Sequence, residues 1–433
     1  VNVPSKAFGE FIEARCATPR VTADELNAML DRGEDVVVLD SRPFDEYQNM
    51  SIPGGIDVPG AELVLRVHDI APDPGTAVVV NCAGRTRSII GAQSLINAGI
   101  PNRVMALENG TMGWHLAGLR LAKGQDRSYP DVSGAGLARA RECAARVAER
   151  CLVPEIDAGT LAQWRADQSR TLFILDVRDP AEYEAGHIEG AKPAPGGQLV
   201  QATDRTVGVR GARLVLVDDN GVRASMTASW LIQMGWEDVH VLPMGKGDGL
   251  GAEPLVTGPH RPFIPGLEDA TPEEVAPKEL AALMVGGGAQ VVDLTDSRRH
   301  RKGHVPASRF AIRANMPGNL DGLDGKGVVV LTSLDGDLAR LAAADAEAGG
   351  RTVKVLRGGT RAWAEAGLPL ATGFIDALDE PVDVWYRPYD LYEGTEQAMA
   401  RYLAWEVALP GQIERDGTTR FRDFPADGPE RAP

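Results

Sequence analysis

A short run of aliphatic side chains, followed further on by a second such run, recurs three times along this chain of 433 residues. Runs made almost entirely of Val, Leu and Ile are typical of strands that are buried on both faces of a sheet. A segment with a helical pattern follows the second run of each copy. The first runs lie at 36–39, 172–175 and 291–292, the second runs at 77–80, 214–217 and 328–331, and the helical segments at 88–98, 224–234 and 338–348.

This alternation of strands and helices predicts an α/β fold of three tandem modules, each a mainly parallel sheet with helices on both faces. The length of the chain fits about three domains of ordinary size. We expect aromatic side chains between residues 385 and 405 to dock the C-terminal extension onto a domain. The expected division is a connector helix at 1–17, a catalytic module at 18–125, a linker helix at 126–152, inactive modules at 153–258 and 259–373, and a helical C-terminal extension at 374–433.

Charge and composition argue against several functional classes. The chain carries 61 acidic and 45 basic side chains, a net charge of −16, whereas a nucleic-acid binder needs basic surfaces. It contains no run of about 20 apolar residues that could span a membrane. Four cysteines are too few for a disulfide framework, and the first residues lack the pattern of a signal peptide, so we expect a cytoplasmic protein. A start at Val1 rather than Met is expected of a chain that is processed or cut from a longer one.

One cysteine stands where chemistry is expected. Cys82 follows the buried run that ends the second strand of the first copy, and a helix begins shortly after it. Ligands of parallel sheets bind beyond the carboxyl ends of the strands, and amide groups with a positive helix dipole converge there. Arg85 and Arg87 add positive charge, and Gly84 lets the backbone curl tightly. These features favour a thiolate over a thiol, so we predict that Cys82 is a nucleophile.

The unit around Cys82 resembles the rhodanese sulfurtransferases. It combines a strand, a cysteine loop and a helix, with Asp40-Ser41-Arg42 ahead and the pair Gly110 and Trp114 behind. The threefold arrangement looks like that of bacterial rhodaneses with four such modules, which implies that a first module is missing ahead of residue 1. We expect Asp40 and Arg42 to support the site by fixing the strand end, with Arg42 able to pair with Glu46.

The resemblance implies a reaction and a set of site residues. In this family the loop cysteine takes a sulfane sulfur from a donor such as thiosulfate, releases sulfite, and passes the sulfur to cyanide or to a thiol. On this match Cys82 is the catalytic nucleophile and persulfide carrier, Arg85 and Arg87 hold the donor, and neither a cofactor nor a metal is needed. The implied substrate-binding residues are Ala83, Gly84, Arg85, Thr86, Arg87 and Ser88.

The residues of this loop also bear on three alternatives to a thiosulfate sulfurtransferase. Relatives that use mercaptopyruvate have small neutral residues in the loop, whereas two arginines suit the thiosulfate dianion. Cysteine phosphatases need Cys-x5-Arg, but Arg87 stands five positions after Cys82 and gives Cys-x4-Arg, a ring that suits a single sulfur atom. A sulfur relay or scaffold that hands persulfide sulfur to a partner protein remains an alternative to a free-standing enzyme.

The second and third copies lack the cysteine. Alignment by sequence pattern places Asp219 and Thr332 at the position of Cys82, and neither side chain can form a persulfide. We therefore expect these modules to be structural or to dock partners. His300 and His304 are four residues apart, but His187 occupies the matching place in copy two, so we interpret His304 as a turn residue of the repeat and not as a metal ligand.

The other three cysteines do not follow a strand in this way. Cys143 and Cys151 lie on one face of the linker helix, where packing explains them. Cys16 could act as a resolving thiol if the connector folds over the Cys82 loop.

Overall fold

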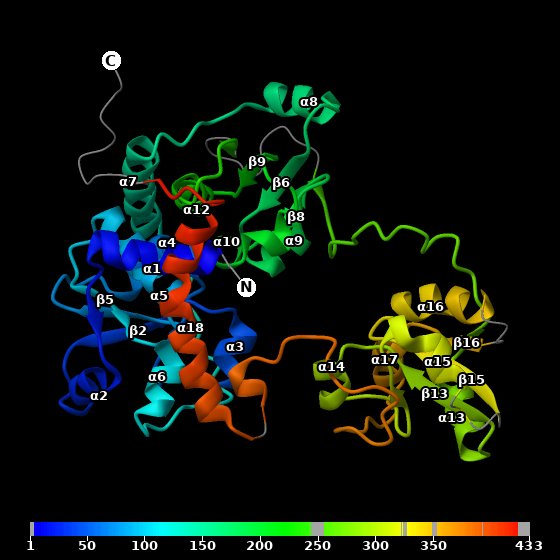
Figure 1. Cartoon of the computed structure of the whole chain (residues 1–433). Helices are drawn as coiled ribbons and strands as arrows, with labels where there is room; N and C mark the ends of the chain where they lie inside the picture. Colours follow the sequence, from blue (N-terminus) through cyan, green and yellow to red (C-terminus); the bar gives the residue numbers. More distant parts are fainter. Residues whose placement is uncertain are drawn as a thin grey trace. The chain divides into compact units, whose positions relative to one another are not determined.

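The computed structural model describes residues 4–243, 255–321, 323, 327–348, 353–391 and 393–422. The chain forms two compact units, each described here by itself. One consists of Val1–His260 together with Glu396–Pro433, and the other of Arg261–Thr395. Figure 1 shows the first two modules in blue to green and the third in yellow to orange. Within the described residues, no helix combines the length and the apolar character needed to cross a membrane.

The first module is a parallel five-stranded sheet covered on both faces. Its strand order is β1 (Arg20–Val21), β5 (Val104–Leu107), β4 (Ala77–Asn81), β2 (Val36–Asp40) and β3 (Ile56–Asp57). Its helical elements are α2 (Ala23–Asp31), α3 (Phe44–Asn49), η1 (Gly60–Glu62), α4 (Leu63–Ile70), α5 (Thr86–Ala98) and α6 (Gly110–Leu116).

Strand β4 is buried on both faces, as its run of valines predicts. Val78 and Val80 pack in one apolar cluster with Ile89 of α5, while Val79 packs in another with Leu26 of α2. Successive side chains of a strand point to opposite faces, so a strand between two layers of helices needs an apolar residue at every position. The expected α/β fold is confirmed.

The second module belongs to the same unit. Its strand order is β10 (Val239–Leu242), β9 (Arg213–Val217), β6 (Leu172–Asp176) and β8 (Lys192–Pro193), and β11 (Leu255–Val256) pairs antiparallel with β7 (His187–Ile188). Its helices are α8 (Ala158–Ala166), α9 (Pro180–Ala185), α10 (Gly196–Gln201), α11 (Thr203–Thr206) and α12 (Val222–Gln233).

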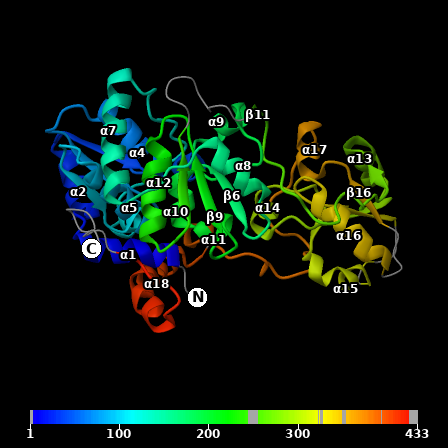
Figure 2. The same cartoon turned by 90° about the horizontal axis from the view of Figure 1, so that it is seen from above.

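One apolar core joins the first two modules. The linker helix α7 (Gly134–Arg150) packs between α4 and α12, and its Cys143 and Ala144 belong to a cluster that contains residues of both sheets. Figure 2 shows α7 beside these two helices. The backbones also touch directly, because a methyl group added at Gly197 would lie 2.9 Å from the Cα of Gly60. This close approach requires glycine.

The third module repeats the architecture of the first. Its parallel sheet has the order β12 (Glu274–Val275), β16 (Val353–Leu356), β15 (Val328–Thr332), β13 (Ala289–Asp293) and β14 (Arg309–Phe310). Its helical elements are α13 (Pro277–Val285), α14 (Ser297–Lys302), η2 (Arg313–Asn315), α15 (Met316–Asp321), α16 (Asp337–Ala348), α17 (Gly359–Glu365) and, from the extension, η3 (Pro388–Asp390).

Two terminal helices pack on the first module. Helix α1 (Pro4–Cys16) lies against α5, and α18 (Thr395–Asp416) brings Leu409 and Ile413 against Ala7 of α1. Both views show α18, in red, next to α1 (Figures 1 and 2). The two ends of the described chain therefore meet beside the start of α5.

The C-terminal extension was expected to dock onto a domain through its aromatic residues, and such contacts occur in each of the two units. Tyr386 donates a hydrogen bond to Ser297 in the third module, at 2.8 Å. Tyr402 instead contacts Lys6 of α1 in the other unit. Tyr392 and residues 423–433 lie outside the described residues.

Candidate functional site

Cys82 is the first residue after β4, whose last residue, Asn81, pairs with Asp40 of β2. Its side chain is 2% exposed, and its Sγ lies 3.5 Å from Ser88 Oγ in the first turn of α5. Ser88 in turn donates to the carbonyl oxygen of Arg85, at 2.8 Å. The thiol therefore lies buried at the carboxyl edge of the sheet, beside the N-terminus of a helix of 13 residues.

The loop is held in place by the first turn of α6. The amides of Thr111 and Met112 donate to the carbonyl oxygens of Cys82 and Ala83, at 2.8 and 3.0 Å. A methyl group at Gly110 would lie 2.2 Å from the Cys82 oxygen, and this residue has a φ of 55°. Only glycine fits there, which explains why Gly recurs behind the cysteine loop in the sequence.

Gly84 is required for room rather than for backbone conformation. It is absent from the glycines with positive φ, so the predicted tight curl is not its reason. A methyl group at this position would lie 2.8 Å from Glu406 Oε2 and 3.4 Å from the ring of Tyr402, both on α18. The C-terminal helix thus covers the cysteine loop directly.

Arg85 fastens the loop to α1. Its guanidinium donates to Glu10 at 2.6 and 2.8 Å, to Glu13, and to Asn109 at 3.3 Å. Burial raises the pKa of Glu10, although Arg85 opposes that shift. The positive charge of Arg85 is therefore balanced by two carboxylates, and its predicted role in holding the donor stays a prediction.

Arg87 and Arg42 both lie near Glu46 but have different hydrogen-bond partners. Arg87 donates to Glu46 at 2.7 Å. Arg42 makes a bidentate pair with Asp40 at 2.8 and 2.7 Å, and Asn81 also donates to Asp40 at 2.9 Å. Burial lowers the pKa of Arg42, but Asp40 and, more weakly, Glu46 raise it, so that the net shift is upward. Pairing of Arg42 with Glu46 stays a prediction, and the network at Asp40 ties the ends of β2 and β4 together.

The cysteine position in the second copy is Asp218, one residue before the predicted Asp219. The ladder pairs Asp176 of β6 with Val217, as it pairs Asp40 with Asn81, so Asp218 corresponds to Cys82. Its two carboxylate oxygens accept hydrogen bonds from the amides of Gly221 and Ala224, at 2.7 and 3.1 Å. Burial raises the pKa of Asp218, and Arg223 together with these amides opposes the shift.

The third copy needs the same correction. Asp293 pairs with Thr332, so Ser333 and not Thr332 stands at the cysteine position. The amide of Thr360 donates to the Ser333 carbonyl at 2.9 Å, as the amide of Thr111 does at Cys82. Ser333 Oγ accepts from the amide of Ala339 at 3.3 Å.

The remaining histidines and cysteines have packing roles. His187 and His304 each contact the carbonyl oxygen four residues earlier, at 2.8 and 2.7 Å, which supports their reading as equivalent turn residues. His300 pairs with the buried Asp293 at 2.7 Å. Across the described ranges, no group of three or more His, Cys, Asp or Glu side chains could hold a metal ion.

The other three cysteines lie outside the Cys82 loop. Cys143 is buried with His68 at 3.8 Å and Arg146 at 3.2 Å, and Cys151 is buried near Gln233. Cys16 is exposed at the end of α1. The condition for its resolving role is met, because α1 packs on the Cys82 loop, but the role itself stays a prediction.

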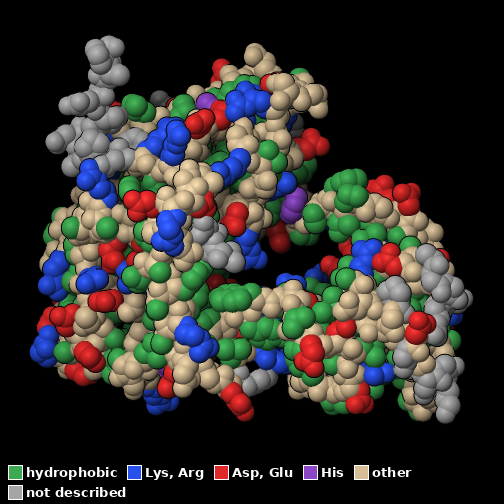
Figure 3. All heavy atoms as spheres, in the orientation of Figure 1, with side chains coloured by type: hydrophobic (Ala, Val, Ile, Leu, Met, Phe, Trp, Pro, Cys, Tyr) green, Lys and Arg blue, Asp and Glu red, His purple; other side chains and the backbone are tan. Residues whose placement is uncertain are grey.

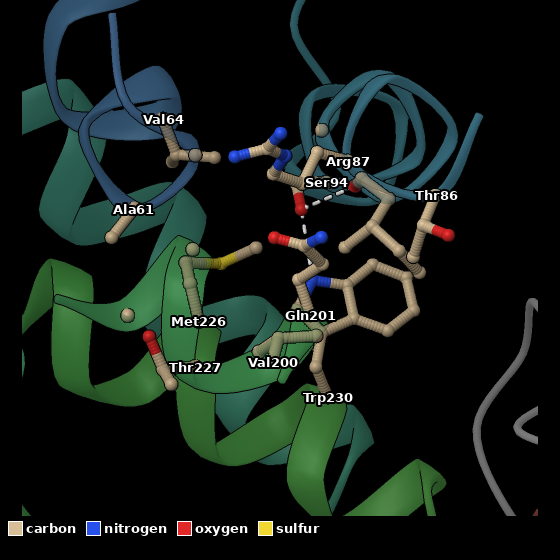
Figure 4. A pocket seen from close by; sticks show the side chains of 15 residues that line it. Ala61, Val64, Thr86, Arg87, Ser94, Val200, Gln201, Met226, Thr227 and Trp230 are labelled. Carbon is tan, nitrogen blue, oxygen red and sulfur yellow. Dashed lines mark hydrogen bonds between the residues drawn. The ribbon is translucent and has the colours of Figure 1, made fainter. Parts of the chain in front are cut away.

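A small cavity of about 30 Å³ lies between the first two modules. Figure 4 shows Thr86, Arg87 and Ser94 of α5 facing Met226 and Trp230 of α12 across it. The Trp230 indole donates to Ser94 at 2.8 Å. A volume of this size holds only one or two water molecules, and Cys82 does not line it, so the cavity marks the joint between modules.

Three α/β modules, one with a cysteine between a parallel strand and a helix, define the rhodanese-like class. The chain belongs to the rhodanese-like domain family, whose model matches residues 22–117, 157–246 and 276–366. The resemblance inferred from the sequence is confirmed.

A solved structure of a thiosulfate sulfurtransferase from Pseudomonas aeruginosa is similar over 98% of this chain and 80% of that protein, with 48% identity and a TM-score of 0.91. An HTH-type transcriptional regulator of Mycobacterium tuberculosis is 32% identical over 26% of this chain and 48% of its own length. A tRNA uridine(34) hydroxylase of Bordetella pertussis is 33% identical over 21% and 41%. The chain therefore spans less than half the length of these two curated relatives.

Sequence reasoning missed two elements of the site. The carboxylates of α1 that pair with Arg85, and Tyr402 and Glu406 of α18, lie far from Cys82 in the sequence. The aromatic residues of the extension signalled docking, but no local spacing connected them with the cysteine.

Proposed function

We propose that this chain is a thiosulfate sulfurtransferase that carries sulfane sulfur as a persulfide on Cys82. The strongest support comes from comparing the equivalent loops that begin at Cys82 in copy one and at Asp218 in copy two. In copy two, loop amides bind the oxygens of Asp218 where copy one has the sulfur of Cys82. The same loop shape suits a thiolate in copy one, and amides near a helix N-terminus lower the pKa of a thiol in general.

The reaction has two displacements. The Cys82 thiolate attacks the outer sulfur of thiosulfate, an S–S bond forms, the old S–S bond breaks, and sulfite leaves with that electron pair. The charge is −3 on each side, since a thiolate and a dianion become a persulfide anion and the sulfite dianion. Cyanide or a thiolate then attacks the outer sulfur of the persulfide, and the Cys82 thiolate leaves.

The charged residues fit these steps unequally. Arg87 stands in the first turn of α5, where it donates to Glu46, whereas Arg85 is held by Glu10 and Glu13 of α1. We assign the main attraction for the donor to Arg87 and the loop amides, because the contacts of Arg85 fasten it to α1. The similarity of this chain to a thiosulfate sulfurtransferase, at 48% sequence identity, supports thiosulfate as the donor.

The test is sulfur transfer by purified protein. We expect wild type to release sulfite from thiosulfate, to form thiocyanate with cyanide, and to gain the mass of one sulfur atom. Cys82→Ala should lose all three signals, and Cys143→Ala, which changes a buried cysteine elsewhere, should keep them. Equal rates in wild type and Cys82→Ala would overturn the proposal.

A second function, a sulfur relay to a partner protein, is favoured by one observation. Cys82 is only 2% exposed, so a persulfide on it would be shielded from small molecules. A relay predicts a persulfide that small thiols discharge slowly and a partner protein discharges quickly. On the face in Figure 3, the Lys and Arg side chains of the described residues are scattered among Asp and Glu and form no continuous basic patch.

A further inference from the structure

We propose that Glu406, on the C-terminal helix α18, takes the proton from the thiol that accepts sulfur from Cys82. The inference rests on the proposed function, and it makes the C-terminal extension part of the catalytic site. Nothing in the loop itself offers a base, because its charged side chains are arginines.

Glu406 lies over the cysteine loop. Its Oε2 lies 2.8 Å from where a methyl group on Gly84 would be, and Gly84 is two residues after Cys82. Tyr402, one turn earlier on α18, lies over the same loop, because its ring is 3.4 Å from that methyl position, and it interacts electrostatically with both Cys82 and Arg87. The Met112 side chain reaches the same place from α6, at 3.6 Å from that methyl position.

One oxygen of this carboxylate is buried and has no hydrogen-bond donor. Glu406 is 2% exposed, and within the part of the chain that the structure describes no group donates to its Oε2. Leaving a buried acceptor unsatisfied is destabilising, and more so when the acceptor is charged. A donor supplied by a bound molecule would remove that cost, and the S–H group of an acceptor thiol is such a donor.

The other oxygen is held in place by groups from both ends of the chain. Glu406 Oε1 accepts from Lys6 at 3.0 Å and from the Tyr402 hydroxyl at 2.9 Å, and Lys6 also contacts Tyr402. The Lys6 ammonium balances the negative charge of Glu406. The carboxylate is thereby oriented with Oε2 toward the loop.

Only the second displacement needs this group. Thiosulfate and sulfite carry no proton that must move in the first step. A thiol with an ordinary pKa of about 8.5 is mostly protonated at pH 7 and attacks poorly. Glu406 would take the S–H proton, the thiolate sulfur would bond to the outer persulfide sulfur, and the Cys82 thiolate would leave with the electrons of the broken S–S bond.

Burial of Glu406 and Cys82 has a second consequence. An acceptor reaches them only when covering side chains such as Tyr402 move aside. The negative charge of Glu406 also opposes a dianion at the loop. Removing it should therefore leave persulfide formation unchanged or faster while the thiol step slows.

The experiment separates the two half-reactions in the full chain. Protein is loaded with thiosulfate, freed from it, and mixed with 2-mercaptoethanol or with the low-pKa thiol 2-nitro-5-thiobenzoate. Persulfide loss is followed by quenching and intact mass. For Glu406→Gln we expect normal loading, discharge by 2-mercaptoethanol slowed about 100-fold, and discharge by the low-pKa thiol nearly unchanged. The matched control, Glu414→Gln on the exposed side of α18, should behave as wild type.

The outcomes distinguish the possible failures. If wild type gains no sulfur on Cys82, the proposed function fails, and the role of Glu406 fails with it. If wild type loads but Glu406→Gln discharges normally, or discharges slowly with both thiols, Glu406 is only a cover. Glu406→Asp, which keeps the carboxylate, should recover part of the rate, and the discharge rate of Glu406→Gln should rise with pH as 2-mercaptoethanol ionises.

Discussion

The loops at Cys82 and Asp218 occupy equivalent positions in two neighbouring modules. The first begins with a thiol and the second with a carboxylate. Both follow a buried central strand and precede a long helix. In copy two the carboxylate of Asp218 accepts hydrogen bonds from the loop amides. The loop is thus an anion-binding shape that the fold keeps without the cysteine, and chemistry depends on which side chain stands at its first position.

The arginines that stand five residues after Cys82 and after Asp218 also differ, in the carboxylates with which they pair. Arg87 has Glu46 as its partner, whereas the equivalent Arg223 pairs with Glu182, with Asp219 and with Glu62 of the first module. Arg223 is 1% exposed. Arg223 of the second module therefore serves as a strut, because its ion pair with Glu62 links it to the first module.

The strongest test of this comparison exchanges the loop residue. Cys82→Asp should lower sulfite release at least about 1,000-fold, because a carboxylate cannot carry sulfur. It should nevertheless keep its melting temperature closer to wild type than Cys82→Leu does, since the loop amides can bind a carboxylate. Activity assays and thermal unfolding measure both effects, and a Cys82→Asp protein less stable than Cys82→Leu would contradict the idea of a shared anion-binding loop.

Removing the strut should cost stability without touching the loop at Cys82. Arg223→Met leaves Glu62 buried with one partner fewer, so we expect a loss of about 3 kcal/mol in the unfolding free energy of the unit that holds it. Arg357→Met, which removes an exposed pair with Glu274, should cost under about 1 kcal/mol. Denaturant titrations compare the two, and equal costs would refute the strut.

The turn beneath the cysteine loop gives a smaller effect. Gly110→Ala places a methyl group against the Cys82 carbonyl and should reduce both stability, by about 2 kcal/mol, and the rate of sulfite release. Gly118→Ala has a similar positive φ of 76° but nothing within 4 Å, so it should cost about 1 kcal/mol and leave the rate unchanged. Identical rates in the two variants would show that the turn does not position the loop.

The smallest effect concerns pH. Burial, with Asp40 nearby, raises the pKa of Asp57 from 3.8 to about 7, whereas copy two has Pro193 at this strand position. The folded form then holds a proton that the unfolded chain has lost, so this group's stabilising contribution falls as pH rises from about 4 to about 7. Asp57→Asn should be as stable as wild type at pH 4 and more stable than it at pH 8, because only wild type then buries a charged carboxylate. A difference that is constant with pH, in denaturant unfolding, would disprove this.

The sequence allowed the fold and the cysteine to be predicted because both depend on local patterns. Runs of valine marked β4, and Cys82 followed directly. The register of copy two did not follow from the sequence, because Asp218 and Asp219 are both acidic and only the ladder with β6 decides between them. A choice of one residue at a strand end depends on the neighbouring strand.

Contacts between distant segments were beyond the sequence for the same reason. A spacing of four residues suggested that Arg42 can pair with Glu46, but the hydrogen bond from Arg87 to Glu46 joins two residues that no sequence pattern connects. Lys6 pairs with Glu406, which lies over Gly84 of the cysteine loop, although no sequence pattern connects these distant segments. Helix α1 and helix α18 had recognisable helical character, yet their destinations depend on complementary charges that only the folded chain brings together.

The meeting of Lys6 with Glu406 has a consequence for biosynthesis. A ribosome makes Cys82 more than 300 residues before α18, so the nascent polypeptide leaves its cysteine loop uncovered until translation of the helix is complete. A stop codon or a protease cut ahead of Thr395 would leave folded modules with a naked loop, and C-terminal fusion tags belong beyond Asp416 rather than within the helix.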